Sequence, residues 1–439
     1  MRSTLAACCN WVVGSRMTHD AAFDGLATDS RTAPGGSLFV ALRGENFDAH
    51  AFLDEVALRN VAAIVVEERT AASHLAALSV PLLMVPDTRV ALGQIAQGWR
   101  QRFTLPVIGV TGSNGKTTVK EMIASILVAG FGLAHSVATR GNFNNEIGVP
   151  LTLLRLDDDA RAAVIELGMN HPGEIALLSA MARPTVGLVN NAQREHQEFM
   201  VSVEAVAREN GAVISSLPDD GVAVFPAGDP YTGLWRGLAA ARGQRRVVTF
   251  GLTADADVRC TYVANAFGSD LSVQAGELAF ELTLAAAGVH NVRNALAAIA
   301  CTLAIGMVPE AIVRGLESFA PAAGRLQRKL AANGARVIDD TYNANPDSVR
   351  AAIDVLASAP GPRVLVLGDM GEVGDDGRAF HEEIGAYARA HGIEHLLTLG
   401  QLAADATRAF GAGAVHFSDI GQLERAVDLL ATPLATLLI

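Results

Sequence analysis

The stretch VIGVTGSNGKTTVKEM, residues Val107 to Met122, decides the fold class of this chain. An apolar run leads into a glycine-rich segment, and the amphipathic run KEMIASILVA follows. A strand that turns through glycines into a helix places backbone N–H groups and the positive helix end around phosphates. The usual phosphate-loop pattern has a glycine five residues before Gly115, where this chain has Val110. We interpret the segment as a degenerate phosphate loop; the alternative is a tight glycine turn with a chance lysine.

The loop predicts how a nucleotide would be held. Lys116 would reach the β and γ phosphates, and Thr117 would place its hydroxyl on Mg²⁺. Only three of the 34 lysine and arginine residues are lysines, and one of them is Lys116. A compact ammonium fits between phosphate oxygens better than a planar guanidinium does. The residues expected to bind ATP here are Gly112, Ser113, Asn114, Gly115, Lys116, Thr117 and Thr118.

Composition limits the class of protein. A chain of 439 residues that is 50% hydrophobic and 18% charged has material for two to four packed domains. Its net charge of −12 argues against a protein that coats nucleic acid. The amino terminus lacks a basic-then-apolar signal segment, and the apolar run 122–138 resembles a buried helix followed by a strand more than a membrane span. We therefore expect a cytoplasmic protein without membrane insertion.

The pattern of apolar runs divides the chain into three α/β units, residues 1–102, 103–320 and 321–439. In the first, SLFVALRG and VAAIVVEE are typical of strands and FLDEVALRN of a helix. In the second, strand-like and helix-like stretches alternate, which predicts a parallel sheet with helices on both faces. The period-two stretch 259–288 predicts an antiparallel patch there. The third unit repeats the α/β pattern, and its boundary is placed near Pro321 and Gly324.

Two candidate metal ligands follow strands of the second unit. VIELG ends an apolar run with Glu166, and VNNAQREHQEF follows the next strand with His196. Ligands gather at the carboxyl ends of strands in open α/β sheets, and Mg²⁺ prefers hard oxygen ligands. The alternatives are a solvated loop carboxylate and an ordinary surface histidine.

Several motifs together resemble one enzyme family. GVTGSNGKTT, IELGMNHPGEI, GVHNVRNALAAIA and GRLQ are similar to segments of the Mur ligases. DDTYNANPDSVRAAIDVL, LGDMGEVGDDGRAFHEEIG and TRGNFNNEIGVPLTLL resemble the member that adds D-alanyl-D-alanine to UDP-N-acetylmuramoyl-tripeptide. TDSRTAPGGSLFVALRGENFDAH resembles a UDP-binding domain of the family. The resemblance covers nearly the whole chain.

The resemblance implies a fold and a reaction. The fold would be a central phosphate-loop ATPase domain between a small UDP-binding α/β domain and a Rossmann-like carboxyl-terminal domain. The substrate carboxylate would attack ATP to give an acyl phosphate, and the amine of D-alanyl-D-alanine would displace phosphate. ATP and Mg²⁺ would be required, and we expect a monomer. Lys116, Glu166 and His196 would be catalytic, and Thr117, Glu166 and His196 would hold metal.

The resemblance also assigns binding residues. ATP would be contacted by Asn291, Asn294, Arg325 and Asp340 in addition to the loop. The substrates would be contacted by Ser30, Arg31, Asn46, Asp48, Asn142, Asn144, Asn145, Tyr342, Asn343 and Asn345. Structural alternatives stay open: a capped helix for HNVRNALAAIA, a turn and helix start for DDTYNANPDS, a plain loop for TDSRTAPGG, and turn chemistry alone for 142–145.

Two departures from the family pattern matter. Many members carry a CO₂-modified lysine near the position of Asn210, whereas this chain has no lysine between Lys120 and Lys329. We therefore expect a second metal ion to be held either by a nearby glutamate, Glu204 or Glu209, or by additional water, and we favour water. Relatives also continue beyond LATLLI with a basic stretch and a helix, so the chain is expected to be truncated at its end.

Rival functions follow from the same features. A related ligase that adds a single amino acid would share the architecture, but the Asp-Asn-Pro-Arg motif of the tripeptide-forming member is absent from the sequence. A folate polyglutamylating enzyme would lack the first 100 or so residues. A nucleotide-dependent switch protein would need neither a UDP-binding domain nor an asparagine-rich acceptor region.

Overall fold

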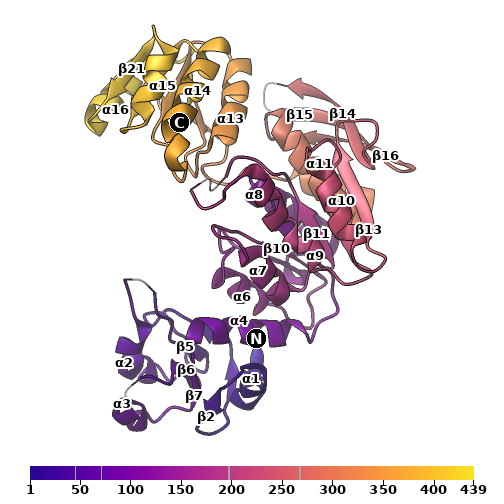
Figure 1. Ribbon diagram of the computed structural model, residues 1–439, viewed down its shortest axis with the longest axis vertical. Helices are drawn as coiled ribbons and strands as arrows, with labels where there is room; N and C mark the ends of the chain where they lie inside the picture. Colours follow the sequence, from indigo (N-terminus) through magenta and orange to yellow (C-terminus); the bar gives the residue numbers. More distant parts are fainter. Residues whose placement is uncertain (45, 71, 196–197, 266–267) are drawn as a thin grey trace.

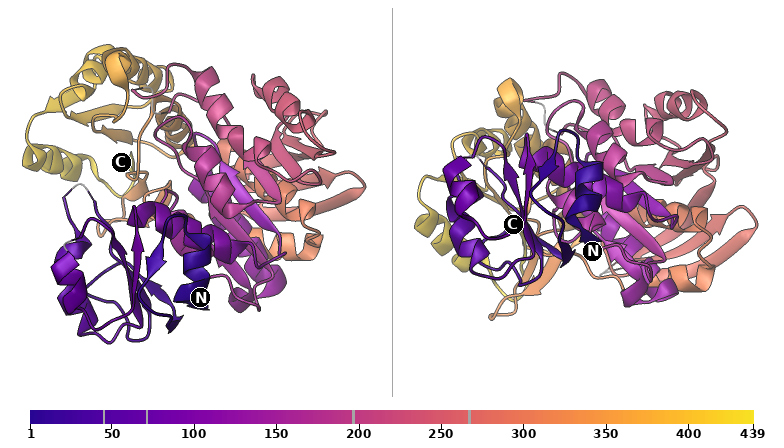
Figure 2. Two further views of the ribbon diagram at one scale, coloured as in Figure 1. Left: turned by 60° about the horizontal axis from the view of Figure 1, so that its bottom comes forward. Right: turned by 90° about the horizontal axis from the view of Figure 1, so that it is seen from below.

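The chain forms three α/β units, as the fold-class prediction requires. The computed structural model describes residues 1–44, 46–70, 72–195, 198–265 and 268–439. Within those residues the strands form one antiparallel pair and three larger sheets of five, nine and six strands. Figure 1 shows the units along the longest axis, with the first at the bottom and the third at the top. Figure 2 shows that the first and third units lie on the same side of the central one.

The first unit is built on a five-stranded sheet in the order β2-β7-β6-β5-β4, parallel except between β2 and β7. Strands β5 and β6 lie within the two apolar runs predicted as strands, whereas the buried strand β7 was not predicted. The elements are β1 (Arg2–Thr4), α1 (Leu5–Trp11), β2 (Arg16–Met17), β3 (Ala22–Asp24), β4 (Leu26–Ala27), β5 (Leu38–Val40), η1 (Ala49–Phe52), α2 (Leu53–Ala57), β6 (Ala63–Glu67), α3 (Ala72–Ala77), β7 (Leu82–Val85) and α4 (Thr88–Arg100).

Helix α4, which the sequence analysis does not predict, joins the first unit to the second. Asp87 caps it by accepting hydrogen bonds from the N–H groups of Arg89 and Val90. At its other end, the Trp99 indole N–H donates to the carbonyl of Leu156 at 3.0 Å, and Arg100 Nε donates to the carbonyl of Ala182 at 3.0 Å. The buried face of α4 therefore fixes the first unit against the central unit.

The central sheet has the order β16-β15-β14-β13-β12-β11-β8-β10-β9. It is parallel from β9 to β14, and β14, β15 and β16 are antiparallel, which confirms both predictions for this unit. The elements are β8 (Val107–Thr111), α5 (Lys116–Phe131), η2 (Leu133–His135), β9 (Ser136–Ala138), α6 (Gly148–Leu153), β10 (Ala162–Glu166), α7 (Glu174–Ala182), β11 (Val186–Val189), α8 (Val203–Asn210), α9 (Ala212–Ser215), β12 (Val222–Pro226), α10 (Thr232–Ala240), β13 (Arg246–Gly251), β14 (Val258–Asn265), β15 (Gly268–Ala275), β16 (Leu278–Leu284), α11 (Val289–Ala304) and α12 (Pro309–Glu317).

Strand β8 shows why apolar residues run continuously along this sheet. Val107 packs into one hydrophobic core and Ile108 into another on the opposite face, because side chains alternate along a strand. Strand β8 lies between β10 and β11 and is parallel to both. The chain segments that follow these three strands therefore gather at one edge of the sheet.

The third unit has a six-stranded sheet in the order β17-β18-β22-β19-β20-β21. The last strand inserts between β18 and β19 and is parallel to both. The elements are β17 (Gln327–Leu330), β18 (Arg336–Asp339), α13 (Pro346–Ser358), β19 (Arg363–Leu367), η3 (Gly374–Asp376), α14 (Gly377–Ala390), β20 (His395–Leu399), α15 (Ala403–Phe410), β21 (Ala414–Phe417), α16 (Ile420–Leu430) and β22 (Thr436–Leu438). The three sheets fall within the predicted ranges, and the domain boundaries themselves stay a prediction.

Candidate active site

The glycine loop after β8 has the conformation that a phosphate loop requires. Gly112 and Gly115 have φ angles of 133° and 81°, which L side chains rarely adopt. A Cβ on Gly112 would lie 2.9 Å from Asn190 Cβ, and one on Gly115 would lie 2.6 Å from Asn294 Oδ1. Helix α5 begins directly after the loop at Lys116. The degenerate glycine pattern therefore still builds a strand, a tight loop and a helix N-terminus.

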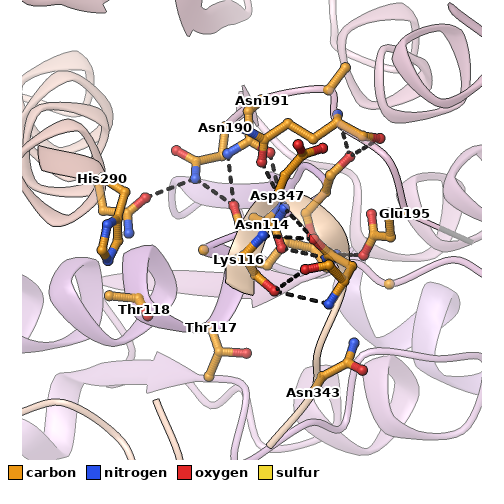
Figure 3. A pocket seen from close by; sticks show the side chains of 18 of the residues that line it. Asn114, Lys116, Thr117, Thr118, Asn190, Asn191, Glu195, His290, Asn343 and Asp347 are labelled. Atoms are coloured by element: carbon orange, nitrogen blue, oxygen red, sulfur yellow. Dashed lines mark hydrogen bonds and ion pairs between the residues drawn. The ribbon is translucent and has the colours of Figure 1, made fainter. Parts of the chain in front are cut away.

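Lys116 turns back over the loop. Its Nζ donates to the carbonyls of Gly112 at 2.6 Å and Ser113 at 3.0 Å, and to Glu195 Oε1 at 2.7 Å. The Lys116 side chain is 14% exposed and that of Glu195 is 7% exposed. The lysine is thus neutralised by a buried carboxylate in this structure (Figure 3).

Glu166 lies at the end of β10 beside the start of α5. Its Oε1 accepts hydrogen bonds from Thr117 Oγ1 at 3.1 Å and from Asn144 Nδ2 at 2.9 Å. Glu166 is 1% exposed, and its Oε2 is buried without a hydrogen-bond partner. The interpretation as a solvated loop carboxylate is therefore wrong. A buried carboxylate oxygen without a donor is poised for a cation, since burying it unpaired is costly.

Asparagine amides hold the loop in place. Asn191 Oδ1 accepts from the N–H of Asn114 at 2.9 Å, and Asn190 Nδ2 donates to the carbonyl of Asn114 at 2.8 Å. Asn190 Nδ2 also donates to Asn294 Oδ1 at 2.9 Å, and Asn294 Nδ2 donates to Asn291 Oδ1 at 3.2 Å. This network connects the loop to α11. The cap of α11 is Gly288, so Asn291 is not the helix cap that the structural alternative proposed.

The third unit reaches the loop through Asn345. Its Nδ2 donates to Asn114 Oδ1 at 2.8 Å, while its Oδ1 accepts from the N–H of Ser348 at 2.9 Å. Asn345 is the N-cap of α13 in a capping box, so the turn-and-helix-start alternative is correct as well. Asn145 likewise accepts from the N–H groups of Ile147 and Gly148, so turn chemistry is part of its role.

Burial shifts the pKa values of two titratable side chains that line the same cavity as the loop. Burial raises the pKa of the Asp340 carboxyl to about 7, against the lowering effects of the Leu326 N–H and of Arg325. Burial lowers the pKa of His290 to about 4, so its imidazole is neutral at pH 7. Arg325 stacks over the Tyr342 ring at 4.0 Å from its centroid. Both residues of that stack line the same cavity as Asp340 and His290.

A cavity of about 1060 Å³ runs from the loop to the third unit. Most of the predicted site residues line it. Those residues are Ser113, Asn114, Gly115, Lys116, Thr117, Thr118, Asn142, Asn144, Asn145, Glu166, Asn291, Asn294, Arg325, Asp340, Tyr342, Asn343 and Asn345. Gly112 shapes the loop without lining the cavity, and His196 lies outside the described residues.

The four residues predicted to contact UDP lie in the first unit and do not line this cavity. Arg31 is exposed and pairs with Asp29 at 2.8 Å. Asp48 accepts from His50 Nδ1 at 2.7 Å and pairs with Arg43 at 2.8 Å. Ser30 is buried and Asn46 is exposed. Their role as a UDP site stays a prediction.

Several residues around the loop are not predicted from the sequence. Asn190 and Asn191 follow β11, and the rule that ligands gather at strand ends could have found them. The pairing of Arg194 with Asp347 joins positions 153 residues apart, and the pairing of Lys116 with Glu195 joins positions 79 apart. Nothing in the local pattern signals contacts of that separation.

The chain is similar to known proteins over most of its length. The Mur ligase middle domain matches residues 110–302, and the Mur ligase glutamate ligase domain matches residues 324–439. The UDP-N-acetylmuramoyl-tripeptide--D-alanyl-D-alanine ligase of Escherichia coli strain K12 is 38% identical over 429 residues, covering 97% of this chain and 92% of the relative. The chain belongs to the Mur ligase family.

Further relatives within the Mur ligases carry the same name. The enzyme of that name from Haemophilus influenzae is 37% identical and covers 90% of this chain and 84% of its own. A crystal structure of MurF from Acinetobacter baumannii superposes with a TM-score of 0.90 at 33% identity, covering 100% of this chain and 95% of that one. The predicted resemblance and the predicted fold class are therefore both confirmed.

The position expected for a modified lysine is filled by Asn210 in this Mur ligase. Asn210 Oδ1 accepts from the N–H of Gly112 at 2.8 Å, and Asn210 is 1% exposed. Glu209 accepts from the N–H groups of Gly173 and Ile175, each at 2.9 Å, at the start of α7. Glu204 pairs with Arg208 at 2.6 Å on the surface. Neither glutamate lines the cavity, and water as the additional metal ligand stays a prediction.

Two findings concern the described part of the chain only. No group of three or more histidine, cysteine, aspartate or glutamate side chains there is arranged to hold a metal ion. No helix among those residues is long and apolar enough to traverse a bilayer.

Proposed function

We propose that this chain joins D-alanyl-D-alanine to UDP-N-acetylmuramoyl-tripeptide at the expense of ATP, as its relatives are named for doing. The observation that carries the proposal is a single cavity lined by the phosphate loop, by Glu166 and by the third unit. Together these groups can bring a triphosphate, a carboxylate and an amine to one place. Near-complete coverage of the relatives supports the same conclusion, since 92% of the Escherichia coli enzyme is matched.

Lys116 and the start of α5 are assigned to the phosphates. The first N–H groups of a helix have no partner within it, so they are available to phosphate oxygens. The Lys116 ammonium would neutralise charge that builds on the transferred phosphoryl group. Preorganised groups of this kind supply most of the catalysis in phosphoryl transfer.

Glu166 and Thr117 are assigned to Mg²⁺. The buried Oε2 of Glu166 lacks a donor, and the Thr117 hydroxyl lies 3.1 Å from Oε1. These are the hard oxygen ligands that Mg²⁺ prefers, and Mg²⁺ commonly keeps waters and phosphate oxygens as its other ligands. When bound, the ion would offset phosphate charge. Asn144 would hold the Glu166 carboxylate in orientation through its 2.9 Å hydrogen bond.

The part of the cavity beside α11 is assigned to the nucleoside. His290, Asn291 and Asn294 line it, and Asn294 lies against the loop, where its Oδ1 accepts from Asn190 Nδ2 at 2.9 Å. A neutral His290 can both donate and accept a hydrogen bond, as recognition of a base requires. Arg325, Tyr342 and Asp340 come from the third unit, so the nucleotide would touch both units.

The proposed reaction consists of two successive substitutions. The tripeptide carboxylate oxygen attacks the γ phosphorus, the bond from phosphorus to the β-phosphate oxygen breaks, and ADP leaves with the electron pair. The amine of D-alanyl-D-alanine attacks the acyl carbon, the bond from carbon to the phosphate oxygen breaks, and phosphate leaves. The amine loses a proton to solvent or to a base. A free carboxylate is a poor acyl donor, and the phosphate makes it a good one.

The experiment that tests the function is an acceptor panel with mass detection of the product. The enzyme is supplied with ATP, Mg²⁺ and UDP-N-acetylmuramoyl-tripeptide, and then with D-alanyl-D-alanine, D-alanine or L-lysine. We expect product with the dipeptide alone. Product with a single amino acid would instead favour the related ligase, and no product with any acceptor would contradict the proposal.

Location and assembly complete the proposal. We place the reaction in the cytoplasm, where ATP and UDP-linked precursors are available, and we expect a monomer. Size-exclusion chromatography with light scattering checks the second point, and a dimer would contradict it.

A further inference from the structure

Arg194 and Glu195 are adjacent in the chain, but their side chains contact different units. Arg194 donates to Asp347 Oδ1 at 2.6 Å and to Glu383 Oε2 at 2.7 Å, and both carboxylates belong to the third unit. Its backbone N–H also donates to Asp347 Oδ2 at 3.0 Å. The Arg194 side chain is 23% exposed, and the two partner carboxylates hold its pKa above the usual value. A partly buried bidentate pair of this kind is stronger than an open surface pair.

Glu195 turns the other way, toward the phosphate loop. Its Oε1 accepts from Lys116 Nζ at 2.7 Å (Figure 3). A carboxylate buried to this degree needs a partner of opposite charge. Lys116 is the residue that the proposed function assigns to phosphate. In this structure Glu195 is therefore paired with the Lys116 ammonium, which is the positive charge that a phosphate oxygen would need.

A phosphate oxygen and the Glu195 carboxylate cannot both contact one ammonium without strong repulsion. They would stand within a few ångströms of each other in a poorly solvated site, where like charges interact strongly. Binding a triphosphate must therefore move Glu195. Because Glu195 follows Arg194 directly in the chain, that movement acts on the segment that Asp347 and Glu383 hold.

We propose that Glu195 occupies the place of phosphate at Lys116 in the nucleotide-free enzyme, and that Arg194 couples its release to the docking of the third unit. Both are positioning residues that act through Lys116 and through the interface between the units. The inference rests on the proposed role of Lys116 in nucleotide binding. Coupling of this kind is reciprocal, so nucleotide binding and docking of the third unit influence each other equally.

The experiment measures ATP affinity in EDTA by calorimetry, because without metal neither turnover nor a metal-ligand role of Glu195 contributes. Wild type, E195Q, R194Q and the double variant form a cycle. E195Q should bind ATP on the order of tenfold more tightly, because the competing charge is gone. In the R194Q background the same change should have a much smaller effect, because the segment is no longer held against the loop.

Matched controls are E204Q and R208Q, which alter the exposed pair on α8 and should leave ATP affinity unchanged. Thermal unfolding verifies that each variant is folded. Unchanged or weaker ATP binding by E195Q in EDTA would overturn the phosphate-surrogate role. An equal effect of E195Q in both backgrounds would overturn the coupling.

Two further arms separate this inference from the proposed function. K116A should lose ATP affinity in every background. If wild type failed to bind ATP at all, the proposed function would fail and the inference with it. If E195Q weakened binding of Mg²⁺·ATP but left binding in EDTA unchanged, Glu195 would be a cation ligand and the inference would be wrong.

Discussion

Asn345 Nδ2 donates a 2.8 Å hydrogen bond to Asn114 Oδ1, which links the start of α13 in the third unit to the phosphate loop of the second. The same side chain caps α13 through its Oδ1. One asparagine thus performs two separable tasks. Serine can cap a helix as well as asparagine does, but it is too short to reach Asn114.

Substitution at Asn345 separates the cap from the bridge. Asn345→Ser should leave the free energy of unfolding within about 0.5 kcal/mol of wild type and still lower kcat/KM for ATP. Asn345→Ala should lower kcat/KM similarly and also cost about 1 kcal/mol of stability. Urea unfolding and steady-state kinetics measure both. Full activity of the serine variant would show that the bridge does not matter.

Glu166 provides a test of the metal site. Glu166→Gln should raise the Mg²⁺ concentration for half-maximal activity by on the order of tenfold or more, because one of few protein oxygen ligands loses its charge. Mn²⁺ binding in the presence of ADP, followed by electron paramagnetic resonance, should weaken in parallel. E204Q is the control, since Glu204 lies on the surface. Metal affinity equal to wild type would remove Glu166 from the site.

The opposite pKa shifts of Asp340 and His290 predict opposite pH dependences of stability. Asp340 has a pKa of about 7 when folded, above its ordinary value. Between about pH 4 and pH 7 the Asp340 carboxyl keeps a proton in the folded state that it has lost in the unfolded state. The contribution of Asp340 to the free energy of unfolding therefore falls as pH rises. His290 has a pKa of about 4 when folded, so its contribution rises with pH between about pH 4 and pH 6.5.

The free energy of unfolding, measured from pH 4 to pH 8, tests the direction of both pH dependences. Asp340→Asn should remove a falling slope, and His290→Gln a rising one, each of at most about 1.4 kcal/mol per pH unit. If Asp340→Asn steepened the fall instead, the aspartate would be ionised in the folded state and its burial would not control its titration.

Asn210 predicts that activity does not depend on CO₂. An amide cannot be carbamylated as an amine can. Asn210 Oδ1 also already accepts a hydrogen bond from the N–H of Gly112 at 2.8 Å. In degassed buffer at mildly acidic pH, added bicarbonate at fixed pH and ionic strength should leave the rate unchanged. A relative with the modified lysine serves as the positive control and should regain activity. Rescue of this enzyme by bicarbonate would mean that another group is being modified.

The sequence predicts what depends on local pattern. The glycines and lysine of the loop identify β8, the turn and α5, and Glu166 follows from an apolar strand that ends in a carboxylate. The contacts that complete the site connect distant positions, as Arg194 does with Asp347 across 153 residues. Such pairs depend on how the three units are placed, and no periodicity encodes that placement. Helix α4 is a further element that was not predicted, and it packs both against β6 of its own sheet and against α6 and α7 of the second unit.

The central claim is that ATP is consumed to activate a peptide carboxylate for one dipeptide acceptor. The measurement that tests it most directly is steady-state phosphate release with each substrate omitted in turn and K116A as the inactive control. Continuous release should require ATP, UDP-N-acetylmuramoyl-tripeptide and D-alanyl-D-alanine together, because the acyl phosphate has no other productive exit. Rapid release from ATP with neither peptide present would contradict the account and favour a nucleotide-dependent switch protein.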